Sequence, residues 1–155
     1  MLIMAIDPGN EWSGWVVYET ADKCPLKWCK SPNSDLLNRI EYTEEDIEWC
    51  AIEQVASYGM AVGKEVFETV YWSGIFAHAF GLERVVRIPR KDVKIHLCGS
   101  LKAKDSNIRQ AIVDRYGGKD KAIGTKKTGY GPLHGINSDV WAALSVAITA
   151  AETKL

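Results

Sequence analysis

The feature that most constrains the fold is an unbroken apolar run at residues 1–6 that ends at an acid, Asp7. A strand that is apolar on both faces lies at the centre of a sheet and is covered by helices on both sides. The run therefore indicates an α/β architecture with a helical layer on each side of the sheet. Pro8-Gly9-Asn10 predicts a turn directly after the acid. We expect Asp7 to lie at the end of a central strand.

The remaining elements are short runs of strand or helix periodicity separated by turn residues. Further strands are expected at residues 14–19, 25–30, 47–54 and 84–88, and helices from Ser34 and at residues 64–80, 92–97, 105–116 and 139–151. The first three strands form an antiparallel meander, and the helices between the later strands make those parallel. The prediction is a single α/β domain over residues 1–155: a mixed five-stranded sheet with helices on both faces.

Three details of this prediction concern the helices and loops. Ser138 is the expected N-cap of the last helix. Residues 117–135 are rich in glycine and lysine, which predicts a mobile loop. The expected apolar side of helix 64–80 includes Phe67 and Tyr71. It could pack on the sheet or pair with a second copy of the chain around a two-fold axis.

Two more acids share the placement of Asp7 at the mouth of an apolar element. Glu53 ends the run 49–52, and Asp139 opens the apolar helix pattern 140–148. A carboxylate in such a place is costly unless it meets a cation, and several together suit hard divalent ions. Paired ions held by carboxylates drive phosphodiester hydrolysis. We expect the three acids to hold two Mg²⁺ ions, with Asp7 bridging them; taken singly, each acid could instead be a turn or capping residue.

The charge is distributed unevenly along the chain. Residues 1–83 carry 5 basic and 14 acidic side chains, whereas residues 84–130 carry 13 basic and 4 acidic ones. Such a basic block indicates a surface that faces a polyanion, although it could also be an ordinary solvated face. The candidate phosphate-binding residues are Lys102, Lys104, Arg109, Lys126 and Lys127.

Localisation follows from what the chain lacks. No apolar stretch approaches the roughly 18 residues of a membrane span, and residues 1–7 suit a strand better than a signal peptide. The cysteines have no metal-binding spacing, which favours reduced thiols. We expect a cytoplasmic protein with no membrane partner and no nucleotide cofactor.

Several motifs resemble those of RuvC-type Holliday-junction resolvases. Ile6-Asp7-Pro8-Gly9 followed by Ser13-Gly14-Trp15 resembles the first motif, and residues 51–55 resemble the second. Residues 142–148, with Asp139 one turn upstream, resemble the alanine-rich last helix, and the basic stretch 89–118 is similar to the region between these motifs. The resemblance covers nearly the whole chain. The compact length of the chain and its loop 130–135 suggest a bacteriophage-like branch of the family. We therefore expect the protein in the cytoplasm of a bacterial cell or of a phage-infected host.

The resemblance implies a ribonuclease H-like fold, a homodimer and cleavage of four-way DNA junctions with Mg²⁺ or Mn²⁺. Asp7, Glu53 and Asp139 match the metal-binding acids. The family often has another acid three residues after Asp139, where this chain has Ala142; His134 or Asn137 could compensate. The expected reaction leaves paired symmetric nicks with 5′-phosphate ends.

Other residues receive roles from the resemblance and from their chemistry. Ala56 stands where the family often has an aromatic wedge, so Tyr58, with Met60 beside it, is the candidate to stack on bases at the junction centre. Lys104 or Lys102 could stabilise transition-state charge. His134 could orient water or act as a general acid. Each of these side chains could equally be an ordinary loop or surface residue.

Alternative functions remain open at this stage. A ribonuclease H-like nuclease on RNA–DNA hybrids or flaps would use the same metals, and a branched-DNA-binding protein would not cleave at all. An actin-like sugar kinase or ATP-binding module also uses a DxG turn to handle phosphate. The chain is too short for the two lobes of that kinase and lacks a second glycine-rich phosphate motif.

Overall fold

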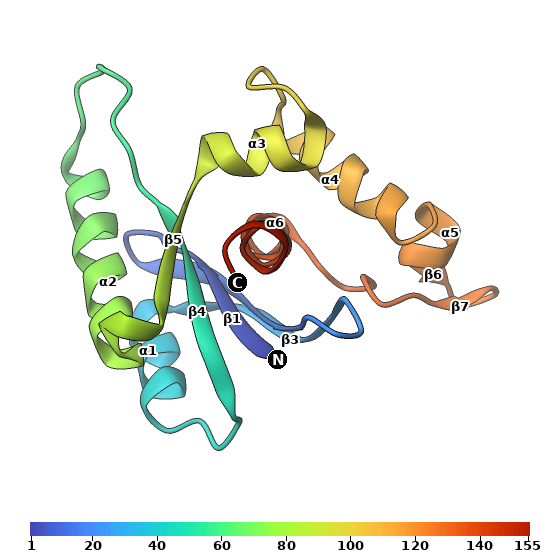
Figure 1. Cartoon of the computed structure of the whole chain (residues 1–155), viewed down its shortest axis with the longest axis horizontal. Coiled ribbons are helices and arrows are strands. Elements are labelled where there is room, and N and C mark those ends of the chain that lie inside the picture. Colours follow the sequence, from blue (N-terminus) through green and yellow to red (C-terminus); the bar gives the residue numbers. More distant parts are fainter.

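The computed structural model describes residues 1–155 and contains a five-stranded sheet with helices on both faces (Figure 1). The strand order is β3-β2-β1-β4-β5. The strands are β1 (Leu2–Asp7), β2 (Trp12–Glu19), β3 (Cys24–Pro32), β4 (Ile47–Gln54) and β5 (Val85–Pro89). Strands β1, β2 and β3 pair antiparallel, whereas β1, β4 and β5 pair parallel. The predicted mixed sheet is confirmed.

The register of β1 and β4 brings two of the predicted acids to the same edge of the sheet. Ile6 pairs with Ile52 in the parallel ladder, so Asp7 and Glu53 follow at the carboxyl ends of neighbouring strands. On the other side of β1, Asp7 pairs with Gly14 of β2. Both acids therefore leave the sheet at its centre, where ligands bind in open α/β sheets.

The helices divide between the two faces of the sheet. Helices α1 (Asn33–Glu41) and α2 (Lys64–Phe80) cover one face, and α3 (Arg90–Cys98), α4 (Asp105–Arg115) and α6 (Ser138–Thr153) form the other layer. Met4 and Ile6 of β1 pack under α1 and α2, whereas Ile3 and Ala5 pack under α6. This alternation explains why the first strand is apolar throughout. No helix is both long enough and apolar enough to cross a membrane.

Residues 117–135 are more ordered than the sequence predicts. They contain α5 (Lys119–Ala122) and a hairpin of β6 (Gly124–Thr125) and β7 (Gly129–Tyr130). The one remaining element, the 3-10 turn η1 (Leu82–Arg84), lies elsewhere, between α2 and β5. Ala122 and Leu133 are buried, and the Leu133 N–H donates to the Ala122 carbonyl at 2.8 Å. The segment is therefore not the irregular loop that its glycines and lysines indicate, because two buried apolar side chains hold it against the core.

Two helix details also differ from the prediction. The N-cap of α6 is Asn137, and Ser138 is the first helical residue, with a φ of 35°. Helix α2 buries Phe76 and Phe80, whereas the Phe67 and Tyr71 side chains are each 64% exposed. This helix is apolar around most of its circumference, so periodicity alone did not identify the face that packs on the sheet.

Candidate active site

Two of the predicted acids, Asp7 and Glu53, line two adjoining clefts, and Asp139 lines one of these clefts. One cleft of about 700 Å³ runs from Asp7 and Glu53 past the starts of α2 and α3 to Tyr58. The other, of about 460 Å³, lies between the strand ends and the first turns of α4 and α6, and its lining includes Asp7, Glu53 and Asp139. The acids from β1, β4 and α6 therefore share one cavity.

Asp7 is the acid with no cation of its own. Its carboxylate makes no hydrogen bond or ion pair in the structure, in contrast to Glu53 and Asp139. Burial is the main cause that raises the pKa of Asp7, to about 8, and the charges of Glu53 and Asp139 raise it further. Arg90 opposes this shift only in part. The carboxylate at the centre of the site thus lacks the positive charge that would stabilise its ionised form.

Two side-chain cations flank Asp7 and neutralise its neighbours. The Arg90 guanidinium donates to Glu53 at 3.2 Å and also contacts Asp105 at the start of α4. On the other side, the Lys30 ammonium of β3 lies 2.6 Å from an Asp139 oxygen. Burial raises the pKa of Glu53, and Arg90 counteracts the effect. Of the four carboxylates that line this cavity, three therefore already pair with a cation: Glu53 and Asp105 pair with Arg90, and Asp139 pairs with Lys30.

Gly14 allows the last helix to approach the central strand. A Cβ atom on this residue would lie 2.5 Å from the backbone oxygen of Asp139 and 2.9 Å from the Asp139 Cβ. These separations are shorter than van der Waals contact, so only glycine fits. Since Gly14 pairs with Asp7 in the sheet, this close approach sets the separation between Asp139 and Asp7.

A buried polar pair fixes the turn that follows Asp7. The Ser13 hydroxyl donates to the Asn33 side-chain oxygen at 2.7 Å and accepts a hydrogen bond from the Gly9 N–H at 3.1 Å. The Asn33 amide donates to the Gly9 carbonyl at 3.0 Å, which closes the network. Both polar side chains are almost fully buried. The network therefore ties the Asp7 turn to β2 and to the start of α1.

Replacing Ser13 with alanine is expected to destabilise the protein by about 1–3 kcal/mol, because the Gly9 N–H and the Asn33 oxygen would lose their partner inside the core. Urea unfolding measures the change. Ser57→Ala is the matched control, since Ser57 is exposed and its hydroxyl donates only to a nearby loop carbonyl. Equal stabilities for the two variants would contradict the role of the network.

The other predicted site residues lie at different distances from the acids. Tyr58 lines the larger cleft and Arg109 lines the smaller one, with its guanidinium 4.9 Å from the centre of the Trp141 ring. His134 stacks on Tyr130 with 3.9 Å between ring centres and does not line either cleft. The remaining candidates are exposed on loops and turns outside both clefts: Met60, Lys102, Lys104, Lys126 and Lys127.

Sequence reasoning missed five charged residues that line the clefts and a sixth that pairs with Asp139. The lining residues are Glu65, Arg90, Lys91, Lys94 and Asp105, and the sixth is Lys30. Arg90 and Lys91 begin a helix directly after β5, which is the neighbour of the acid-bearing strand β4. The position of this helix start beside Glu53 was the available signal, because the ends of parallel strands share one edge of the sheet.

The donor set fits hard divalent cations, although the side chains are not arranged around an ion. No three histidine, cysteine, aspartate or glutamate side chains lie close enough together to coordinate one metal. The available donors are carboxylate oxygens, which Mg²⁺ and Mn²⁺ prefer. Arg90 provides positive charge beside Glu53, and Lys30 provides it beside Asp139, whereas the carboxylate of Asp7 has no cationic partner. We infer that the cavity suits hard divalent cations such as Mg²⁺ and Mn²⁺.

Comparisons with known proteins bear on the fold. No protein-family model and no curated protein sequence matches the chain. Among solved structures, it is similar to Thermus thermophilus RuvC in complex with a Holliday junction substrate, with 20% identity, a TM-score of 0.62 and coverage of 97% of this chain and 93% of that one. A second Thermus thermophilus RuvC structure gives 20% identity, a TM-score of 0.63 and the same coverage. The chain therefore has the RuvC-type, ribonuclease H-like fold, as the sequence predicted.

Proposed function

We propose that the chain is a metal-dependent endodeoxyribonuclease that resolves four-way DNA junctions by paired, symmetric nicking. The observation that carries this proposal is the gathering of Asp7, Glu53 and Asp139 in one cleft of a RuvC-type fold. The solved relative bound to a Holliday junction supports the choice of substrate. Paired carboxylates in such a fold are suited to hydrolysis of a phosphodiester rather than to phosphate binding alone.

The proposed chemistry assigns a role to each acid. Asp7 would bridge two Mg²⁺ or Mn²⁺ ions, with Glu53 completing the coordination of one and Asp139 that of the other. When bound, such ions activate the attacking water and stabilise the leaving oxygen. Arg90 and Lys30 would then contribute positive charge at the two sides of the cleft, where the phosphate of the scissile strand is negative.

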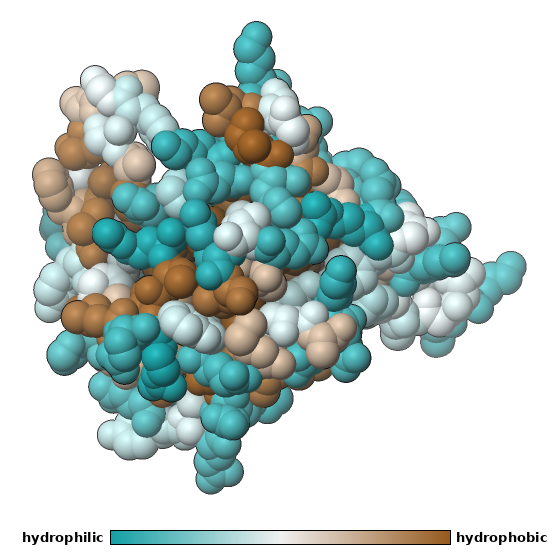
Figure 2. All heavy atoms as spheres, viewed as in Figure 1, coloured by the Kyte–Doolittle hydropathy of each residue, from teal (hydrophilic) through white to brown (hydrophobic).

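A continuous path for DNA leads to these acids. Lys91 and Lys94 of α3 line the larger cleft on one side, and Tyr58, which is 73% exposed, lines it on the other. Figure 2 shows the surface hollowed between the loop after β4 and the segment that follows α3. We propose that the lysines hold phosphates of one arm and that Tyr58 stacks on a base at the junction centre.

Replacing both Lys91 and Lys94 with glutamine is expected to weaken junction binding and to lower its salt dependence. Each lost phosphate contact reduces the slope of log affinity against log salt by about 0.9, so the slope should fall by about 2. Fluorescence anisotropy over a salt series measures it. The pair Lys23→Gln and Lys154→Gln, outside the clefts, should leave the slope unchanged. An unaltered slope in the cleft variant would exclude this path.

The decisive experiment compares substrates in Mg²⁺ or Mn²⁺: a four-way junction, linear duplex, a flap and an RNA–DNA hybrid. Symmetric nicks on the junction alone would support the proposal. Cleavage of the hybrid or flap instead would favour a ribonuclease H-like nuclease that uses the same acids. Tight junction binding without cleavage, under conditions in which the protein binds Mn²⁺, would identify a branched-DNA-binding protein.

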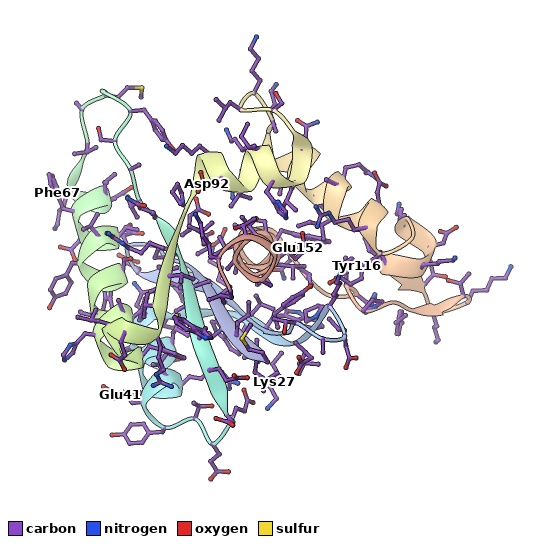
Figure 3. All side chains as sticks on the ribbon, in the orientation of Figure 1. Lys27, Glu41, Phe67, Asp92, Tyr116 and Glu152 are labelled. Carbon is purple, nitrogen blue, oxygen red and sulfur yellow. The ribbon has the colours of Figure 1, made fainter.

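We also propose that the protein acts as a homodimer through α2, since two symmetric nicks require two active sites. The outer side of this helix exposes Phe67, Val70 and Tyr71, and Figure 3 shows Phe67 pointing away from the sheet. Large exposed apolar surfaces of this kind mark interaction sites. Phe67→Asp should convert the dimer to a monomer in sedimentation analysis, whereas Leu26→Asp, an exposed residue on the edge strand β3, should not. A dimer retained in Phe67→Asp would exclude this face.

A further inference from the structure

The smaller cleft lacks a second acid on α6 but has an additional acid on α4. Asp139 and Ala142 both line it from the first turns of α6, and Ala142 offers no oxygen ligand. Asp105, the first residue of α4, lines the same cleft. The cleft therefore regains from α4 the carboxylate that α6 lacks.

The position of Asp105 is fixed by its helix rather than by contacts of its own side chain with the core. Ile108 and Ile112 of α4 are buried, and the Asn107 side chain accepts a hydrogen bond from the Lys104 N–H at 2.9 Å, which defines where the helix starts. The Asp105 side chain is 86% exposed. It is thus held at the mouth of the cleft, where its carboxylate is accessible to solvent and contacts only Arg90.

Arg90 shows that Asp105 and Glu53 can share one cation. The Arg90 side chain is 19% exposed, and its guanidinium contacts Glu53 with one terminal nitrogen and Asp105 with the other. Two carboxylates from different elements therefore reach the two sides of a single positive group. A divalent ion is smaller than a guanidinium and carries twice the charge. It would therefore compete with Arg90 for the same carboxylate oxygens.

We propose that Asp105 is a metal-binding residue of this chain and replaces the acid that Ala142 lacks, an inference that rests on the proposed metal-dependent function. The ligand set would then draw on β1, β4, α4 and α6. Arg90 would exchange its carboxylate partners for the phosphate of the incoming strand.

Direct Mn²⁺ binding, measured by calorimetry on the whole protein without DNA, tests this inference separately from activity. Asp105→Asn should weaken binding by at least about tenfold, the scale on which residues around metal sites act. Asp114→Asn is the matched control, because Asp114 lies on the same helix outside the cleft and accepts a hydrogen bond from Gln110. It should bind Mn²⁺ as the wild type does.

Restoring the missing acid provides the second arm. Ala142→Asp should recover affinity by about tenfold in the Asp105→Asn background but improve the wild type by less than about threefold, since the two acids would serve one position. Equal gains in both backgrounds, or wild-type affinity in Asp105→Asn while Asp7→Asn loses it, would overturn the role of Asp105 and leave the proposed function intact. A wild-type protein that binds no Mn²⁺ would overturn both.

Discussion

Replacing Asp7 with asparagine is expected to abolish cleavage and, at the same time, to stabilise the metal-free protein. The loss of activity should be at least about 10³-fold, because the central ligand of the proposed site is removed. The gain in stability follows from the structure: the Asp7 carboxylate is partly buried, has no cation and lies beside Glu53 and Asp139. Asparagine keeps the shape of the side chain and removes the charge.

The predicted gain in stability should depend on pH, and the raised pKa of Asp7 determines the direction of this dependence. The pKa of Asp7 is raised to about 8 in the folded protein, well above the value of about 4 in an unfolded chain. Between these values the folded state binds more protons than the unfolded one, so the wild type loses stability as pH rises from about 4 to 8. Asp7→Asn should lack this loss. Its Tm in EDTA should therefore be higher than that of the wild type by at least about 2 °C at pH 8 and equal near pH 4.

Metal addition supplies the complementary measurement. Mg²⁺ should raise the Tm of the wild type and leave that of Asp7→Asn unchanged, because a ligand that binds only the folded state stabilises it. Asp22→Asn, an exposed acid in the turn before β3, is the control and should behave as the wild type does. A lower Tm for Asp7→Asn than for the wild type in EDTA would mean that the carboxylate is already stabilised, and would contradict an unpaired central ligand.

Substituting alanine for Gly14 should disable the site without touching any charged group. The added Cβ would lie 2.5 Å from the Asp139 backbone oxygen. Helix α6 cannot yield easily, because Val140, Ala143 and Leu144 behind Asp139 are buried. We expect a loss of about 1–3 kcal/mol in stability from overpacking, and a fall of at least about 10²-fold in cleavage as Asp139 is displaced.

The measurements are urea unfolding, cleavage of the four-way junction and Mn²⁺ affinity. Gly63→Ala is the control, since a Cβ at this N-cap of α2 meets nothing within 4 Å. It should lower stability by at most about 1 kcal/mol, through the weaker N-cap, and should leave cleavage unchanged. If Gly14→Ala bound Mn²⁺ as tightly as the wild type, the spacing of Asp139 from Asp7 would not depend on this contact.

The sequence could predict the parts of the site that local pattern determines. Apolar runs that end in Asp7 and Glu53 indicate neighbouring parallel strands, and the apolar pattern after Asp139 indicates a buried helix. The cationic residues that pair with these acids could not be predicted from local pattern. Arg90 meets Glu53 across 37 residues, and Lys30 meets Asp139 across more than 100, so only the folded topology brings them together.

The failures of the sequence prediction have physical causes as well. Helix α2 has large apolar residues on both sides. The spacing of its apolar residues therefore did not distinguish Phe76, which is buried, from Phe67, which is exposed. In residues 117–135 the glycines favour flexibility, yet Leu133 anchors the segment in the core. A single buried side chain far from its packing partners in the sequence leaves no periodic signal.

The central place of α6 has a consequence for biosynthesis. This helix fills the space between the sheet and the layer of α3 and α4, and it also delivers Asp139 (Figure 1). While the ribosome is still making residues before 138, the sheet lacks its cover on that face and the acids lack their third member. Under the proposed function, a nascent chain therefore lacks the complete set of acids and would not cleave nucleic acid nearby. Completion of the core and assembly of the three acids are one event, because the same helix performs both.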